Sequence, residues 1–285
     1  MIHLEHVSYA YAGHPRPVLD DLSLSIREGE HLALFGANGC GKTTLVRHLN
    51  ALLLPGQGTV AIDGLVTSDP AHWPEIRRRV GMIFQHPDNQ IVGMTAEEDV
   101  AFGPGNLGWM PEEIRRRVGV ALDRFGLLPL ADRPPHTLSG GEKRLLSIAG
   151  VLVMEPRYIA FDEPAAYLDP VGRQQVREAM KRLSAEGIAV IHVTHDAEDM
   201  AAADRLIVME AGRVILDGAP RDSFPELARR AISGFSLPPL MELVERLNAQ
   251  GWRLSQNLTE AAEISREIHD HLLAASRQKP SAGRE

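Results

Sequence analysis

The feature that most constrains this chain is a glycine-rich stretch, Gly36–Thr43, that directly follows an apolar run. Its sequence, GANGCGKT, matches G-x-x-x-x-G-K-S/T, the run before it reads HLALF, and a helical pattern follows over Lys42–Leu53. Such a turn between a strand and a helix lets backbone N–H groups and the positive end of the helix surround a phosphate. The stretch therefore predicts an α/β fold with a nucleotide triphosphate site. The alternative, a chance match in a glycine-rich turn, is disfavoured by the flanking strand and helix.

Two side chains of this phosphate loop, residues 36–43, carry specific chemistry. Lys42 supplies a point charge for the β- and γ-phosphates, and the Thr43 hydroxyl is a ligand for Mg²⁺. The other positions expected to contact the nucleotide are Gly36, Ala37, Asn38, Gly39, Cys40, Gly41 and Thr44. We expect the neighbouring charge and helix end to lower the thiol pKa of Cys40. Phosphoryl transfer to water needs no thiol, so we interpret Cys40 as a tolerated small residue.

A second apolar run, YIAF, ends in the carboxylates Asp162 and Glu163. Carboxylates are costly in a buried strand unless they lie at its end and face a cation. We therefore expect Asp162 to hold Mg²⁺ and Glu163 to orient and deprotonate an attacking water. Taken alone, the pattern also fits a strand that ends in solvent.

The stretch LSGGE, Leu138–Glu142, opens a third element and is called here the signature segment. Ser139 is a good N-cap, and Ser139, Gly140 and Gly141 are expected to leave free N–H groups at a positive helix end. This predicts a second anion site on a different helix from the first. As an isolated motif it would be only a capped helix start.

Apolar runs alternate with helical patterns along the chain, which is typical of a doubly wound α/β core. The strands are predicted at 2–7, 22–26, 31–35, 59–62, 80–84, 158–162, 188–193, 205–209 and 214–217. The helices are predicted at 42–53, 111–125, 141–154 and 171–185. Turns at 12–17 and 27–30 predict that the first strands form antiparallel hairpins, and 86–154 reads as a mainly helical insertion.

Glycine, serine and two prolines mark a boundary near 233–239. Leu240, Leu243, Val244 and Leu247 then recur with helical spacing, and apolar residues from Leu258 to Leu272 predict a second helix. The last residues are expected to fray. This extension either packs on the rest of the chain or forms an interface.

Composition narrows the class of protein. The 285 residues carry 38 acidic against 30 basic side chains, so a nucleic acid is not expected as the main partner. The single cysteine excludes an intramolecular disulfide. Neither a signal peptide nor a membrane-spanning run is recognisable, so we expect a cytosolic protein whose membrane role depends on a partner.

The order of these motifs resembles that of ABC-type ATPases over roughly residues 1–220. The resemblance implies a mostly parallel core sheet, an antiparallel β subdomain and a helical subdomain at about 86–155, all within an ATP-binding domain at 1–235. Residues 236–285 are then a C-terminal helical extension. ATP and Mg²⁺ are the implied cofactors.

The resemblance also implies roles for single residues. Gln85 ends VGMIFQ and is expected to contact Mg²⁺ and the water, and His195 to hold the γ-phosphate and orient Glu163. Tyr11 is preferred over Tyr9 as the ring that stacks on adenine. Family members form head-to-tail dimers, so Ser139, Gly140, Gly141 and Glu142 of one subunit are expected to close over the ATP of the other, with Asp169 nearby.

A narrower resemblance, to the ATPases of energy-coupling-factor importers of the cobalt and nickel type, lies in 86–108, in LSGGEKR and in the tail. It implies a peripheral protein at the cytoplasmic face of the cell membrane, dimeric with itself or a related ATPase. Its partners are a membrane coupling protein and a substrate-binding membrane subunit. A vitamin importer, another ABC importer or an exporter remain alternatives.

Three local features need separate mention. The acidic run Glu97–Asp99 fits either a contact with basic residues of that coupling protein or a solvated helix start. The chain departs from the family pattern at His86, where Asn is common. It departs again at 165–167, where Ala-Ala-Tyr replaces small residues and Gly.

Overall fold

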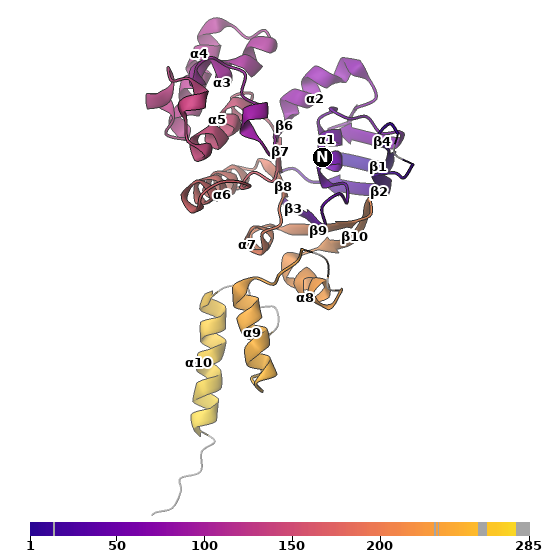
Figure 1. Ribbon diagram of the computed structural model, residues 1–285, viewed down its shortest axis with the longest axis vertical. Helices are drawn as coiled ribbons and strands as arrows, with labels where there is room; N and C mark the ends of the chain where they lie inside the picture. The colour runs from indigo at the N-terminus through magenta and orange to yellow at the C-terminus, as the bar shows by residue number, and fades with distance from the viewer. Residues whose placement is uncertain (14, 231, 233, 256–260, 278–285) are drawn as a thin grey trace, which may run out of the picture.

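The computed structural model describes residues 1–285 except 14, 231, 233, 256–260 and 278–285. Its central sheet has the strand order β10-β9-β3-β8-β7-β6 (Figure 1). The strands are β3 (His31–Gly36), β6 (Val80–Ile83), β7 (Tyr158–Asp162), β8 (Ala189–Val193), β9 (Arg205–Glu210) and β10 (Arg213–Gly218). All neighbours are parallel except β9 and β10. Because parallel strands share one direction, β3 and β7 carry the ends of both predicted phosphate motifs to the same edge of the sheet.

The apolar runs of the sequence are the buried strands of this sheet. Every residue of β3, β7 and β8 is buried. Leu32, Leu34 and Ile191 face α1 (Lys42–Leu49) and a second sheet, whereas Phe161 and Val190 face α5 (Gly140–Leu152) and α6 (Pro170–Ala185). The predicted coverage of these strands on both faces is confirmed.

The second sheet is antiparallel, with the order β2-β1-β4-β5. It consists of β1 (Ile2–Tyr9), β2 (Leu19–Ile26), β4 (Gln57–Ile62) and β5 (Leu65–Val66). The predicted hairpin of β1 and β2 is confirmed. The predicted second hairpin, with a turn at 27–30, is wrong, because β3 pairs in parallel with β8 and β9 rather than with β2. The turn instead passes the chain from one sheet to the other.

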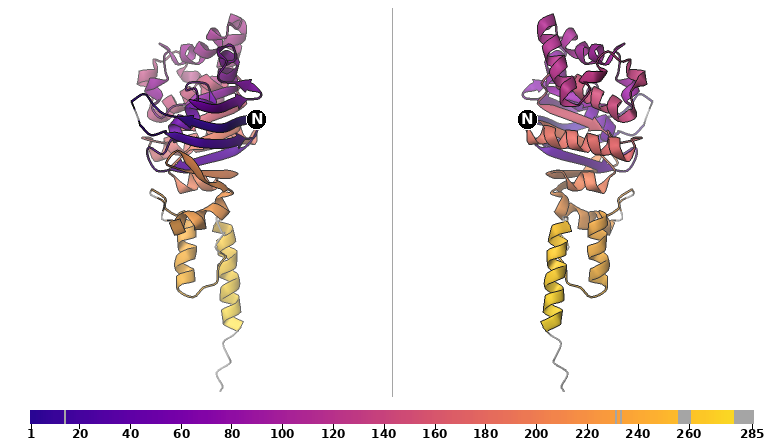
Figure 2. Two further views of the ribbon diagram at one scale, coloured as in Figure 1. Left: turned by 90° about the vertical axis from the view of Figure 1, so that its right-hand side faces the viewer. Right: turned by 90° about the vertical axis from the view of Figure 1, so that its left-hand side faces the viewer.

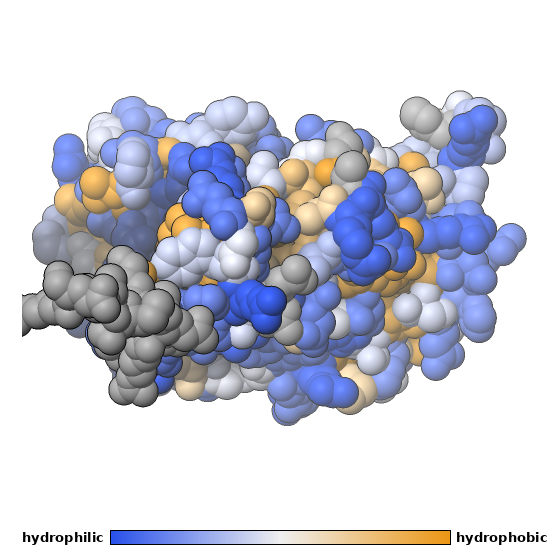
Figure 3. Space-filling view, turned by 90° about the horizontal axis from the view of Figure 1, so that it is seen from below, coloured by the Kyte–Doolittle hydropathy of each residue, from blue (hydrophilic) through white to orange (hydrophobic). Residues whose placement is uncertain are grey.

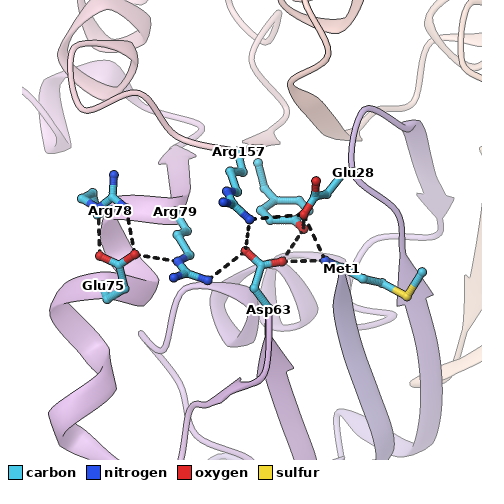
Figure 4. A network of polar contacts seen from close by, with 8 residues as sticks. Met1, Glu28, Asp63, Glu75, Arg78, Arg79 and Arg157 are labelled. Atoms are coloured by element: carbon cyan, nitrogen blue, oxygen red, sulfur yellow. Dashed lines mark hydrogen bonds and ion pairs between the residues drawn. The ribbon is translucent and has the colours of Figure 1, made fainter.

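A network of polar contacts joins the two sheets (Figure 4). The Asp63 carboxylate, which follows β4, accepts hydrogen bonds from the Met1 amino group at 2.5 Å and from the Tyr158 hydroxyl at 2.8 Å. Arg79, at the end of α2 (Trp73–Arg79), pairs with both Asp63 and Glu75. The start of β7, the strand that ends in Asp162, is therefore tied to the antiparallel sheet.

Helices α3 (Ala96–Asn106), α4 (Pro111–Arg124) and α5 gather at one end of the molecule (Figure 1). The sequence predicted α4 and α5 to within two residues but did not predict α2, α3, α7 (Ala197–Ala201) or α8 (Pro220–Arg230). Helix α3 forms although Gly103, Pro104 and Gly105 lie within it, because its buried residues Ala96 and Val100 pack against α5.

The C-terminal helices α9 (Pro239–Ala249) and α10 (Ala261–Arg277) lie side by side and project beyond α8 (Figures 1 and 2). Both predicted helices are present, although Leu258 and the last eight residues lie outside the described residues. Their small core contains Val244, Leu254 and Ile264. Viewed from this end, the surface is mostly hydrophilic with small apolar areas between (Figure 3). The domain boundary at 235/236 stays a prediction.

Candidate functional site

The phosphate loop joins β3 to α1 in a conformation that only glycine allows at its key positions. Gly41 has φ of 111° and precedes the first residue of α1, and a Cβ there would lie 2.7 Å from the Val18 carbonyl oxygen. Lys42 is 6% exposed, and its ammonium group donates to the Gly36 and Ala37 carbonyl oxygens at 2.7 and 3.2 Å. The loop thus holds a buried positive charge at a helix N-terminus, which is suited to a phosphate group.

The predicted magnesium ligands Thr43 and Asp162 meet across the sheet edge. The Thr43 hydroxyl donates to Asp162 Oδ1 at 3.0 Å, although 119 residues separate them. Burial raises the pKa of Asp162, and the hydrogen bond from Thr43 lowers it in part. A hydroxyl and a carboxylate oxygen are hard donors of the kind that Mg²⁺ prefers, so the residues present fit this ion.

Glu163 lies between Gln85, which is predicted to contact Mg²⁺ and the water, and His195, which is predicted to hold the γ-phosphate and orient Glu163. Gln85 Nε2 donates to Glu163 Oε2 at 2.8 Å, and His195 Nε2 lies 3.2 Å from Glu163 Oε1. The Glu163 backbone has φ of 50°, and its N–H donates to the Val193 carbonyl of β8. The carboxylate is therefore held from both sides at the end of β7.

A cavity of about 470 Å³ lies between Lys42, Thr43, Gln85 and Glu163, whereas His195 lines a neighbouring cavity that also borders Glu163. The walls of the first cavity include Tyr11, the phosphate loop, Gln85 and Glu163. The Tyr11 hydroxyl is 3.1 Å from the Thr44 hydroxyl, whereas the Tyr9 ring packs edge-on against buried His48. Of the two tyrosines, Tyr11 is the one that lines the cavity. The exposed side chain of Asn38 and the glycines Gly39 and Gly41 also border it.

The signature segment lies outside this cavity lining and is closed on itself. Ser139 Oγ accepts from the Glu142 N–H at 3.2 Å, and Glu142 Oε2 accepts from the Ser139 N–H at 2.7 Å. This reciprocal capping box corrects the expectation of a free N–H at Ser139. The loop that contains Asp169 packs beside it, since a Cβ on Gly141 would lie 3.2 Å from the Gly172 Cα and Asp169 caps α6 through the Gly172 N–H.

Two other expectations about single residues need correction or refinement. Cys40 is buried, and burial raises the pKa of its thiol despite the nearby Lys42 charge, so the expected lowering is wrong. Within the acidic run, Asp99 is buried and accepts from the Val92 and Gly93 N–H groups. Asp99 is therefore an internal cap rather than a contact for an outside basic group.

Sequence reasoning missed two arginines that support the site. Arg144 is fully buried and donates to the Phe84 and Gln85 carbonyl oxygens, so α5 holds the chain at the predicted catalytic glutamine. Burial lowers the pKa of Arg144 to about 10. Arg177 of α6 pairs with Asp196 and Asp199, which follow His195. A charge within the apolar pattern of α5 was the available signal for Arg144.

Comparison with known proteins agrees with this geometry. A family model described as ABC transporter matches residues 19–166. A cobalt import ATP-binding protein of Syntrophus aciditrophicus is 48% identical over 94% of this chain and 96% of its own length. An energy-coupling factor transporter ATP-binding protein of Caldanaerobacter subterraneus subsp. tengcongensis is 44% identical over 93% of this chain and 97% of its own length.

Solved structures lead to the same family. The protein cbiO1 of Clostridium perfringens, described as part of an ABC transporter complex, has a TM-score of 0.71 and 38% identity over 79% of this chain and 90% of its own. A dimeric ATP-binding cassette bound to ADP and Pi has a TM-score of 0.70 and 30% identity over 77% of this chain and 99% of its own. None of the described helices combines the length and apolar character that a bilayer crossing needs. The predicted α/β cassette fold is confirmed, and the chain belongs to the ABC transporter family as an ATP-binding, ATP-hydrolysing member.

Proposed function

We propose that this chain is the ATPase subunit of an energy-coupling-factor-type importer for cobalt or nickel ions. The proposal that the chain hydrolyses ATP with Glu163 as the base rests on two contacts of the Glu163 carboxylate. It accepts a hydrogen bond from Gln85 and lies beside His195. The importer part is supported by relatives that match nearly end to end and are named for cobalt import and for energy-coupling factor transport. A vitamin importer and other ABC transporters are the alternatives.

In the proposed mechanism, the phosphate loop binds the β- and γ-phosphates through its N–H groups and Lys42, and Tyr11 stacks on the base. Thr43, Asp162 and Gln85 would hold Mg²⁺, and the bound ion would supply positive charge next to the phosphates. Glu163 accepts a proton from the attacking water, and His195 orients Glu163 and contacts the γ-phosphate. The remaining positions at 36–41 and Thr44 complete the cradle.

The proposed catalytic unit is a head-to-tail dimer with a second copy or a related ATPase. The signature residues 139–142 lie outside the phosphate cavity of their own chain, so they reach a nucleotide only on another chain. In this arrangement Ser139, Gly140, Gly141 and Glu142 close over the partner's ATP, and Asp169 lies at the junction.

The segment after Gln85 is the proposed contact with a membrane coupling protein that holds a substrate-binding membrane subunit. Large apolar side chains are exposed there, with Val92 at 59%, Met94 at 79% and Phe102 at 55%. Exposed apolar patches of this kind mark interaction sites. The protein would then be peripheral at the cytoplasmic face of the cell membrane.

Replacement of the proposed base tests the hydrolytic part. We expect Glu163→Gln to lower the ATP turnover rate by about 100- to 10,000-fold, the range for loss of a general base, and to trap an ATP-bound dimer. ATPase assays and size-exclusion chromatography measure the two effects. Glu178→Gln, an exposed carboxylate on α6, is the matched control and should hydrolyse ATP normally. Normal turnover by Glu163→Gln would remove Glu163 from this role.

Affinity purification from detergent-solubilised native membranes tests the importer part. We expect a coupling protein and a small substrate-binding membrane subunit to be recovered with the chain. A variant with Met94→Ser and Phe102→Ser should recover less of both. Recovery of an exporter-type permease would leave the ATPase assignment intact and exclude the importer.

A further inference from the structure

An aromatic stack joins two loops that carry proposed catalytic residues. The His86 and Tyr167 rings have centroids 5.3 Å apart and planes inclined by 20°. His86 follows Gln85 directly, and Tyr167 lies in the segment that runs from Glu163 to Asp169. These are two of the positions at which the chain departs from the family pattern, and they contact each other.

Tyr167 is an unusual choice for its position. Its backbone has φ of 63°, a left-handed conformation that disfavours side chains with a Cβ. Its side chain is 82% exposed, so burial gives the ring little stabilisation. A large ring in a strained, exposed position indicates that a specific contact retains it, and the stack on His86 is such a contact.

The two sides of the stack are attached to different parts of the site. On the His86 side, Lys143 of α5 pairs with Asp88 at 2.7 Å, and Arg144 donates to the Gln85 carbonyl. On the Tyr167 side, the same segment begins with Glu163, whose backbone also has a positive φ. The stack therefore adds a second link between these loops, beside the Gln85–Glu163 hydrogen bond.

We propose that His86 and Tyr167 are positioning residues for ATP hydrolysis, because their stack fixes the 163–169 segment relative to Gln85 and so holds the Glu163 carboxylate in place. This inference rests on the proposed function only in taking Glu163 as the base. Neither ring lines the cavity around the phosphate loop, and Tyr167 instead borders the neighbouring cavity that contains Glu163 and His195, so the stack acts on turnover rather than on ATP binding.

A double-mutant cycle on the full-length protein tests the proposal. We expect Tyr167→Ala and His86→Ala each to lower kcat by about two- to tenfold, as loss of an aromatic pair predicts, with an unchanged KM for ATP. The double variant should lose no more than either single variant. Tyr167→Phe keeps the stack and should retain nearly normal kcat.

Tyr167→Gly separates the stack from backbone strain, because it removes the ring and relieves the left-handed conformation. It should fold at least as stably as the parent and still lose kcat to the same degree. Additive losses in the double variant, an equal loss in Tyr167→Phe, or full activity in Tyr167→Gly would each overturn the proposal. Glu163→Gln separates a failure of this inference from a failure of the proposed function, because normal ATPase activity in Glu163→Gln would show that Glu163 is not the base.

Discussion

The phosphate loop and the signature segment are both glycine-containing helix starts, but their polar groups find different partners. The site around the phosphate loop brings together distant parts of the chain, since Thr43 contacts Asp162 and Gln85 contacts Glu163. The signature segment is closed locally, since Ser139 and Glu142 cap each other within one turn. Most groups of the phosphate site therefore come from one chain. The signature segment is a capped helix start that lies outside the lining of the phosphate cavity.

Because of this difference, we expect changes in the two segments to affect different steps, ATP binding in one case and ATP hydrolysis in the other. A change in the phosphate loop should remove ATP binding from the chain that carries it. A change in the signature segment should leave binding intact and affect hydrolysis at the other subunit of the proposed dimer. Four experiments compare the two segments.

The largest effect is expected for Lys42→Ala. Because Lys42 is a buried charge at the helix start, its loss should weaken ATP binding at least about 30-fold, the lower end for truncation of a buried charge pair. Fluorescent-nucleotide titration measures the affinity for ATP.

Gly140→Asp should bind ATP normally but not hydrolyse it. A Cβ at Gly140 makes only an ordinary 3.4 Å contact with Leu168, so the fold should be kept, whereas the new carboxylate repels the phosphate of the other subunit's ATP.

A mixture of these two inactive variants sharpens the contrast. A mixed dimer pairs the intact phosphate loop of one variant with the intact signature segment of the other, so ATPase activity should partly return. Each variant mixed with itself is the control. No recovery, with mixed dimers shown to be present, would contradict the shared site.

The second effect is a pH dependence of stability that originates in two buried histidines, His48 and His192. Burial lowers the pKa of His192 to about 3, and it also lowers the pKa of His48, which lies behind the phosphate loop and bonds the Thr44 carbonyl. The unfolded chain therefore binds more protons below the ordinary value of 6.5, and stability falls as pH falls. His192 alone should remove about 2 kcal/mol between pH 6.5 and 5.

Urea unfolding at several pH values measures how the unfolding free energy changes with pH, and His192→Gln should make this change smaller. If the unfolding free energy of His192→Gln varied with pH as steeply as that of the parent protein, His192 would not be the cause of the pH dependence.

The capping box of the signature segment behaves differently, because the hydrogen bond from the Ser139 N–H lowers the pKa of Glu142. Its contribution is present above the ordinary glutamate pKa and is lost only as pH falls through the lowered folded value.

The smallest effect is expected for Ser139→Ala. Loss of this cap should cost about 1 kcal/mol, or a melting temperature lower by about 2–4 °C, and should reduce ATPase activity. Thr95→Ala is a matched control, since Thr95 caps α3 through the Glu98 N–H in the same way. It should lower the melting temperature similarly and leave the ATPase activity of the isolated protein unchanged.

The sequence predicted most strands and the main contacts of the site, because apolar runs and motif order carry that information. It failed where the cause was distant in the chain. The pairing of β3 with β8 and β9 involves partners more than 150 residues away, so the local turn at 27–30 was misinterpreted as a hairpin. The extent of helix α3 was not predicted, because packing against α5 overrides the low helix propensity of its glycines and proline.

Among the site residues, the contacts of Thr43 with Asp162 and of Glu163 with Gln85 follow from the shared sheet edge at which β3, β6 and β7 end. The side-chain details do not. Whether the Ser139 N–H is free depends on the rotamer of Glu142, and the thiol pKa of Cys40 depends on burial that outweighs a nearby charge. Both are outcomes of packing, which motif spacing does not specify.

The buried Arg144 determines how the helical end of the molecule can move. Its guanidinium ties α5 to the carbonyl groups of Phe84 and Gln85, so a rotation of α5 as a rigid body carries the end of β6 with it. Such a rotation would change the distance between the Gln85 amide and Glu163, because Glu163 and Asp162 stay at the end of β7.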